Sequence, residues 1–284
     1  MELRPLYVLA FAVGTTLGLL VLMQLLQRIG SRHTIASDLE ADNSARRLVR
    51  VGQVVGVFLV SASAVKNCAT SDSILRDVLA VAGFGAVAVV LLVLTGRFGI
   101  RLLLQDRLEK EIERGNDAAG LAAGAHYVAA GIITSRAIGG SDLRSLGLSL
   151  VFFVIAQVTL HVFVSLFRAL TTYDDADQIH GENMAAALSY SGALVAFSII
   201  IARALDGDFV TWPESLRGYG GVLLLALTLY PVRQLFVQVL MLHSPFTLRG
   251  GRLDRGIAVE RNEGMGALEG AAYLATALSI AQLV

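Results

Sequence analysis

The sequence predicts an all-α membrane protein, a polytopic bundle of eight transmembrane helices built from two parallel four-helix repeats. Three observations lead to this prediction. The chain is too apolar for a soluble domain of 284 residues, because 55% of its residues are hydrophobic and only 16% are charged. Its apolar residues gather into runs of about 20, the helical length that crosses a hydrocarbon core. Its two halves also share a sequence pattern in register.

Eight apolar segments have the length of membrane-spanning helices. The first is too long for a secretion signal and lacks a convincing cleavage site, so we expect it to be retained. The predicted spans are 6–27, 48–67, 78–100, 117–138, 146–169, 186–205, 219–240 and 264–284. We place the first repeat at 1–140 and the second at 141–284.

The distribution of basic residues predicts the topology. The loops after the first, third, fifth and seventh spans, with the helix ends beside them, carry 16 of the 23 basic residues. The positive-inside rule places these loops in the cytoplasm and both termini outside. We therefore expect a multi-pass membrane protein.

The repeat is visible when the chain is compared with itself. The fourth and eighth spans match at one constant offset, and the second and sixth spans match at another. The aligned pairs are Asn116 with Asn262, Asp117 with Glu263, Gly120 with Gly266, Gly124 with Gly270, Tyr127 with Tyr273, Asp42 with Glu182 and Asn43 with Asn183. Because each unit has an even number of spans, the two halves should share one orientation in the membrane.

At the residues that begin these helices, Asn43, Asn116, Asn183 and Asn262, the chain resembles the YjfL-like bacterial inner-membrane family, which is domain-of-unknown-function family 350. The resemblance covers nearly the whole chain as two tandem copies. It implies four-span units without an established chemistry, in a multi-pass protein of the bacterial inner (plasma) membrane. Some members occur beside genes for phage-shock-type membrane-remodelling proteins or polyamine-synthase-like enzymes, which implies a role in envelope stress or polyamine handling. The chain departs from its own second copy at Arg46, Arg47 and Arg50, which replace neutral residues.

Small residues follow two of the asparagines at helical spacing. Gly120 and Gly124 share one face with Asn116, and the matching glycines, Gly266 and Gly270, share one face with Asn262. Such a face favours close packing of membrane helices, with the asparagines as helix caps. Alternatively, the four asparagines ring a cytoplasmic vestibule on a substrate or ion pathway.

Two ionisable side chains fall inside predicted spans. Glu269 lies seven residues beyond Asn262, about 10 Å along the helix, where a charge is costly and marks a functional site by default. It either lines a polar cavity or forms a partnered interhelical hydrogen bond. His126 is a second pathway candidate, although lone histidines often serve as satisfied packing groups. Arg97 and Arg233, late in the third span of each unit, are interpreted as anchors at the membrane interface.

No catalytic constellation is present in the sequence, so we expect no enzyme and no cofactor. Walker A, nucleophile-elbow and HExxH motifs are missing, and the single cysteine, Cys68, offers no metal-ligand set. The acidic loop from Asp174 to Glu182 does not match a calcium loop, so no metal site is predicted. A formal net charge of zero gives no field for binding nucleic acid.

These observations leave two functional hypotheses. The first is a non-enzymatic membrane component that maintains or senses the state of the envelope together with a cytoplasmic peripheral membrane protein. The second is a channel or transporter for a small cation or polyamine. The expected partners are the lipid bilayer, that peripheral protein and, as a further possibility left open by the sequence, a second copy of the chain.

Overall fold

The computed structural model describes residues 4–28, 40, 42–69, 73–104, 108–140, 142–207 and 209–284. Every regular element within these residues is a helix, so the all-α prediction is confirmed. The long helices are α1 (Arg4–Arg28), α3 (Ser44–Cys68), α4 (Ile74–Leu104), α6 (Asp117–Ala137), α7 (Leu143–Arg168), α9 (Met184–Ala204), α10 (Trp212–Ala226) and α13 (Glu263–Leu283). The short ones are α5 (Leu108–Glu113), α8 (Asp175–His180), α11 (Leu229–Arg233), the π-helix η2 (Gln234–Met241) and α12 (Arg252–Ala258).

Seven segments of the described chain are long and apolar enough to cross a membrane. They are Leu9–Leu26 in α1, the helices α3, α4, α6, α7 and α9, and the segment Trp212–Met241. These correspond to the first seven predicted spans. The eighth, 264–284, forms α13, which is as long as α6 and α9 but carries two glutamates and is not among the seven. Its membrane crossing therefore stays a prediction, as does the division into four-helix repeats.

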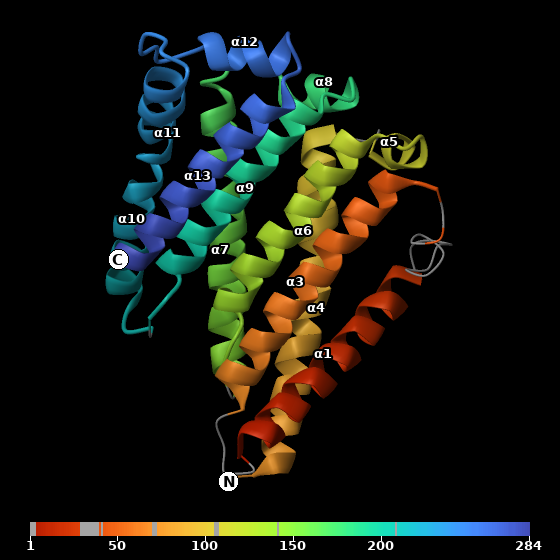
Figure 1. Ribbon diagram of the computed structural model, residues 1–284. Coiled ribbons are helices and arrows are strands. Elements are labelled where there is room, and N and C mark those ends of the chain that lie inside the picture. Colours follow the sequence, from red (N-terminus) through yellow and green to blue (C-terminus); the bar gives the residue numbers. More distant parts are fainter. Residues whose placement is uncertain are drawn as a thin grey trace.

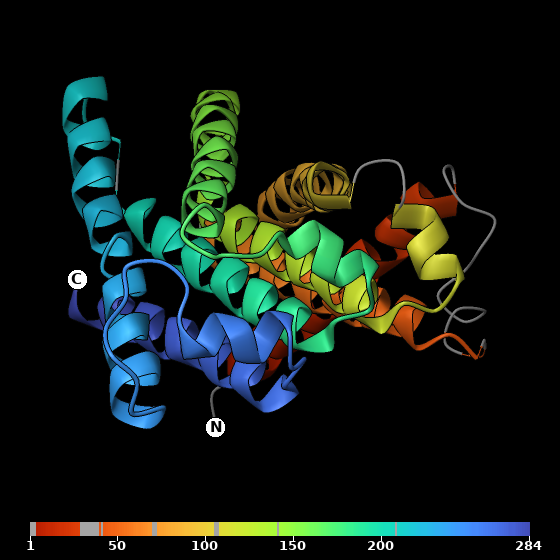
Figure 2. The same cartoon turned by 90° about the horizontal axis from the view of Figure 1, so that it is seen from above.

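Four helices stand side by side in a row, in the order α3, α6, α9 and α13 (Figure 1). All four begin at the same end of the bundle, which we call the Asn end because an asparagine precedes each of them. Helices α4, α7 and α10 lie behind the row, as the view from above shows (Figure 2). The short helices α5, α8 and α12 lie across the Asn end (Figure 1).

Glycines bring neighbouring helices of the row into backbone contact. A Cβ on Gly120 would lie 2.6 Å from the Cα of Ala45, and a Cβ on Gly124 would lie 2.7 Å from the carbonyl oxygen of Leu48. The second half repeats this geometry. A Cβ on Gly266 would collide with the backbone of Ala185, and one on Gly270 would lie 2.8 Å from the carbonyl oxygen of Leu188. Dispersion contacts between such closely spaced backbones hold membrane helices together where burial itself supplies little drive.

The seventh predicted span is not one continuous helix. It divides into α10, α11 and η2, and Pro231 lies in the first turn of α11, where its missing N–H costs least. The wider π-helical turns follow directly after Arg233. Such turns are rare and often accompany functional sites.

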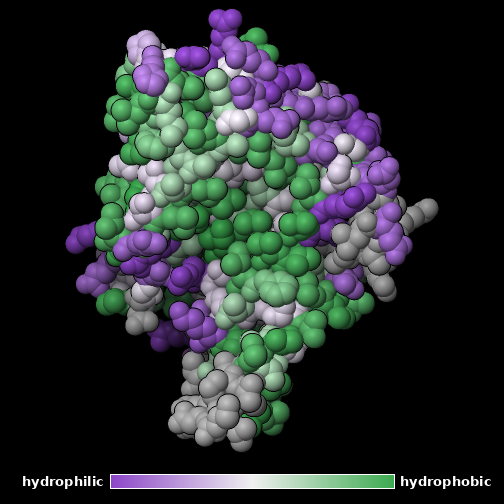
Figure 3. Space-filling model, in the orientation of Figure 1, coloured by the Kyte–Doolittle hydropathy of each residue, from purple (hydrophilic) through white to green (hydrophobic). Residues whose placement is uncertain are grey.

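The outer surface is apolar, as a lipid-facing surface should be. On α7, Val151, Val154, Val158 and Val162 form an exposed stripe. The space-filling view shows a broad hydrophobic face and a hydrophilic margin at the Asn end (Figure 3). Exposed aliphatic surface of this extent is typical of a membrane protein.

Candidate functional site

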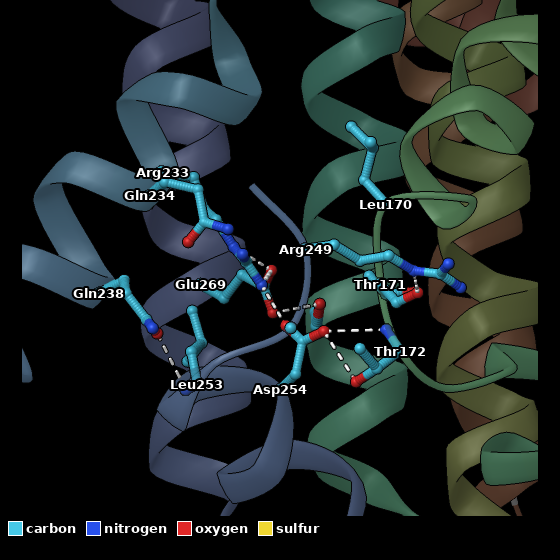
Figure 4. A network of polar contacts seen from close by, with 12 residues as sticks. Leu170, Thr171, Thr172, Arg233, Gln234, Gln238, Arg249, Leu253, Asp254 and Glu269 are labelled. Atoms are coloured by element: carbon cyan, nitrogen blue, oxygen red, sulfur yellow. Dashed lines mark hydrogen bonds and ion pairs between the residues drawn. The ribbon is translucent and has the colours of Figure 1, made fainter. Parts of the chain in front are cut away.

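A buried cluster of ionisable side chains lies at the Asn end of the second half. Arg233, Glu269 and Asp254 are each at most 1% exposed. Arg233 donates from Nε to Glu269 over 2.5 Å and from Nη2 to Asp254 over 3.0 Å, and Nη2 also contacts Glu269. Figure 4 shows the three side chains converging from α11, α13 and α12. In a medium of low polarity such charges persist only when they are paired and hydrogen-bonded.

Neutral donors satisfy the outer oxygens of the two carboxylates. The Ser189 hydroxyl donates to Glu269 over 2.7 Å. The backbone N–H of Thr172 donates to Asp254 over 2.9 Å, and its hydroxyl donates over 3.2 Å. The cluster holds two carboxyl groups and one guanidinium, and these donors offset part of the cost of burying them.

Local structure positions each member of the cluster. The turn before α12 contains Gly250 and Gly251 at φ of 73° and 113°, values that glycine adopts readily, and it directs Asp254 back toward the bundle. Gln238 fixes the start of this helix by accepting the N–H of Leu253 over 3.1 Å. The guanidinium carbon of Arg233 lies 5.4 Å from the centre of the Tyr230 ring, within cation–π range.

Three buried polar atoms at or beside the cluster have no hydrogen-bond partner within the described chain. They are Nη1 of Arg233, Oε1 of Gln234 and the hydroxyl of Tyr173. Burial, reinforced by the negative charges of Glu269 and Asp175, raises the pKa of the Tyr173 phenol well above its usual range. Buried polar groups without partners are rare in native proteins, so these atoms distinguish the cluster from a fully satisfied ion pair.

His126 belongs to a second buried group at the centre of the row. Its Nε2 lies 2.7 Å from the hydroxyl of Tyr190, and its ring stacks on that of His161 with centroids 6.4 Å apart. A Cβ on Gly99 would collide with the His126 ring, so this glycine makes room for it. The histidine is therefore a packed and partnered group.

Helix α9 lies between the two groups. Its adjacent residues Ser189 and Tyr190 bond to Glu269 on one side and to His126 on the other. The guanidinium of Arg168 lies 5.7 Å from the Tyr190 ring centre and pairs with Asp175 over 2.8 Å. Burial raises the pKa of Asp175 to about 7, and the negative charge of Glu269 adds to this, although Arg168 opposes it.

The four predicted asparagines lie apart from one another, one at the start of each helix of the row. Each side-chain oxygen accepts the backbone N–H three residues later, which is the N-cap hydrogen bond. The distance from the backbone nitrogen to the asparagine Oδ1 is 2.9 Å at Asn43, 3.1 Å at Asn116, 3.3 Å at Asn183 and 3.2 Å at Asn262.

Three of these asparagines also bind the next short helix along the chain. The Nδ2 of Asn43 donates to the carbonyl of Ile112, that of Asn116 to Ile179 and that of Asn183 to Ile257, each over 2.8 Å. The residues directly before Asn116, Asn183 and Asn262 all have positive φ, at 84°, 61° and 51°. The Asn end thus repeats one device: a short helix, a left-handed residue and an asparagine that joins two helices.

Asn116 has an additional acidic partner. Its Nδ2 donates to Glu111 over 2.7 Å, and Arg114 donates to the same carboxylate over 2.8 Å. Burial alone would raise the pKa of Glu111, but hydrogen bonds from Asn116, Arg114 and His180 lower it below its usual value. This acid therefore holds α5 against the start of α6.

An open cleft of about 870 Å³ lies at the opposite end of the bundle, between the ends of α6, α7, α9 and α10. Its charged lining residues are Arg136, Arg203, Asp206 and Glu214. Asp206 pairs with Arg136 over 3.1 Å and with Arg203 over 2.9 Å. Elsewhere, no set of three or more His, Cys, Asp or Glu residues within the described ranges is arranged to hold a metal ion.

The interpretation of Arg233 as an interface anchor is wrong. Its side chain is fully buried, because two carboxylates and an aromatic ring surround it inside the bundle. Sequence reasoning also overlooked Asp254, which follows Arg233 by 21 residues and shares no helical pattern with it. The signal for Arg233 was Glu269 itself, since a buried acid requires a cation at a similar depth.

Comparison with known proteins agrees with this architecture. The family described as Domain of Unknown Function (DUF350) matches the chain in two tandem regions, over residues 1–138 and 142–284. The chain belongs to the DUF350 family. This DUF350 protein is also 26% identical, over 157 residues, to a UPF0719 transmembrane protein of Aquifex aeolicus (strain VF5). The match covers 55% of the chain and 58% of that relative. No solved structure matches significantly.

The family, the transmembrane relative and the seven apolar helices together identify a multi-pass membrane protein.

Proposed function

We propose that this DUF350 protein is a non-enzymatic component of the bacterial inner membrane that presents a rigid cytoplasmic platform to a peripheral protein of envelope maintenance. The platform consists of α5, α8 and α12. The observation that carries the proposal is the thrice-repeated asparagine bridge, which fixes each short helix to the start of a helix in the row. Rigid elements make precise binding surfaces.

The side chains that are candidates for an ion pathway also make internal contacts. Glu269 is bonded to Arg233 and Ser189, and His126 is bonded to Tyr190. Among the asparagines, Asn116 and Asn183 are at most 1% exposed, and each both caps its own helix and bonds to a short helix. This pattern favours a scaffold over a conduction path.

The surface of the platform carries exposed charges of both signs. Lys110 and Glu113 lie on α5, Asp177 belongs to α8, and Arg255 on α12 lies 3.7 Å from Glu260. Interspersed charges suit recognition of a folded protein, whereas a nucleic acid would require a basic stripe. The positive-inside rule supports a cytoplasmic location for this end.

Complementation tests the proposal. Cells that lack the protein should show a raised proton leak across the inner membrane, and the wild-type gene should return the leak to its normal level. A charge-reversed platform, with Arg252→Glu and Arg255→Glu, should insert normally but leave the leak raised. The matched control, Arg217→Glu on α10, should return the leak to its normal level. A normal leak with the platform variant would refute the proposal.

A channel or transporter for a small cation or polyamine is the second candidate. The open cleft at the opposite end favours it, because Glu214 lies on its wall, forms no ion pair within the described residues and would attract a cation, whereas Asp206 is already paired with Arg136 and Arg203. Flux in proteoliposomes made with pure protein measures this directly. Flux that requires Glu269, and that Glu269→Gln abolishes without unfolding the protein, would replace the scaffold proposal with transport.

A further inference from the structure

The last helix of the row has one exposed face. Helix α6 stands between α3 and α9, so both of its sides in the row are covered. Helix α13 packs against α9 and against α11, η2 and α12. The face of α13 turned away from Gly266 and Gly270, the glycines that meet α9, is exposed.

Burial of matched residues defines this uncovered face. On α6, Ala118, Ala125 and Ala129 lie at helical spacing away from the glycines that meet α3, and they are 1%, 7% and 0% exposed. Their counterparts 146 residues later are Gly264, Ala271 and Ala275, and all three are exposed. We call these three residues the α13 face.

The first helix of the row has a complementary exposed face. On α9, Ser191 directly follows Tyr190, which contacts His126 of α6, and Ser198 lies seven residues later on the same face. These two serines are 8% and 0% exposed. Their counterparts 140 residues earlier, Val51 and Phe58 on α3, are 57% and 54% exposed. Val55 lies between them and is 40% exposed. We call these three residues the α3 face.

The two exposed faces are therefore the two sides of one interface that the chain already forms internally. The contact between α6 and α9 joins the first half to the second. In the repeat, the α6 residues of this contact match the α13 face. The α9 residues match the α3 face. Because α3 and α13 both begin at the Asn end, a second copy can supply the missing neighbour without inverting in the membrane.

Asn262 provides an independent sign of a missing neighbour. The other three asparagines each use Nδ2 to bind a backbone carbonyl of the next unit in the row. Asn262 makes the cap bond to Met265, but its Nδ2 has no hydrogen-bond partner in the described part of the chain. The next unit along the row would belong to another copy.

Charge at the Asn end fits the same arrangement. Helix α3 begins with Arg46 and Arg47, where α9 has alanines. The start of α13 exposes Glu260 and Glu263. Bringing α3 beside α13 would place basic and acidic residues at the same level of the membrane.

We infer that copies of this chain associate head to tail, with the α3 face of one copy packed on the α13 face of the next. The contact is heterologous, so copies form a ring if the rotation closes and an open row if it does not. Small residues on the α13 face allow the close approach that drives helix association in lipid. The inference does not depend on the proposed function.

Disulfide cross-linking in native membranes tests the inference in a Cys68→Ala background. Val51→Cys and Ala271→Cys in the same chain should produce a ladder of dimers and higher species. When two populations carry one cysteine each, a dimer should form only on mixing. A dimer from either single variant alone would indicate a twofold contact and overturn the head-to-tail arrangement.

A bulky substitution provides the second arm. Ala275→Trp should remove the ladder of the cysteine pair, whereas Val154→Trp on the exposed stripe of α7 should leave it intact. If the cysteine pair gives only monomer while both thiols react with a lipid-soluble maleimide, lipid covers the two faces and the inference is refuted.

Discussion

Removing one member of the buried ion cluster should destabilise the protein more than any surface change. Arg233→Met leaves Glu269 and Asp254 buried without their cation, and breaking a buried pair in this way costs about 3–5 kcal/mol. Glu269→Gln keeps an oxygen for Ser189 and leaves Arg233 paired with Asp254. It should cost only about 1.5–3 kcal/mol, the range for a lost hydrogen bond to a charged group.

A double-mutant cycle of these two substitutions isolates the contact between Arg233 and Glu269. The double variant should lose less stability than the two single variants together, by about 1–3 kcal/mol, because residues in direct contact couple. Unfolding would be measured in mixed micelles with increasing denaturing detergent and followed by circular dichroism. Additive costs, or a cost below about 1 kcal/mol for Arg233→Met, would show that the arginine does not hold this acid in the folded protein.

Three further predictions follow from matched residues. Asn116→Ala should lower the thermal midpoint more than Asn262→Ala, because Asn116 is buried and also bonds to α5 and α8, whereas Asn262 only caps its helix. Gly124→Ala should lower the free energy of unfolding by about 1–3 kcal/mol through overpacking, as measured by denaturant unfolding. Gly221→Ala, which has open space around the glycine, should be neutral or slightly stabilising. Because the pKa of Asp175 is raised to about 7, its contribution to stability should be lost as pH rises from about 4 through 7, and a pH series of melts should show this loss in wild type but not in Asp175→Asn.

The row of helices could be predicted because its determinants are local in the sequence. Each helix of the row starts at an asparagine, and in α6 and α13 glycines follow four and eight residues later. These spacings indicate a cap and a small-residue face without any knowledge of the partner helix. The partner was not predictable in the same way, since Gly120 meets Ala45 across 75 residues of chain.

The short helices escaped prediction for a different reason. Segments of six or seven residues such as α8 and α12 do not form stable helices alone, so propensity and periodicity give little signal for them. Tertiary bonds from Asn116 and Asn183 hold them in place. An asparagine can be recognised as a cap from sequence, but the use of its second polar atom depends on a neighbour that the sequence does not indicate.

Arg233 shows how far physical reasoning could have gone. An arginine at a helix end can extend to the membrane surface or turn inward. The inward placement is favourable only where acidic side chains pair with the guanidinium. Glu269 had already been placed inside a span, and a buried carboxylate needs a cation at its own depth. Arg233 is the basic residue late in the preceding span of the same half. Pairing it with Glu269 would therefore give the arginine an acid and the carboxylate a cation. Asp254 was beyond reach, because its position depends on the return of the chain at Gly250 and Gly251, whose left-handed backbone only the structure specifies.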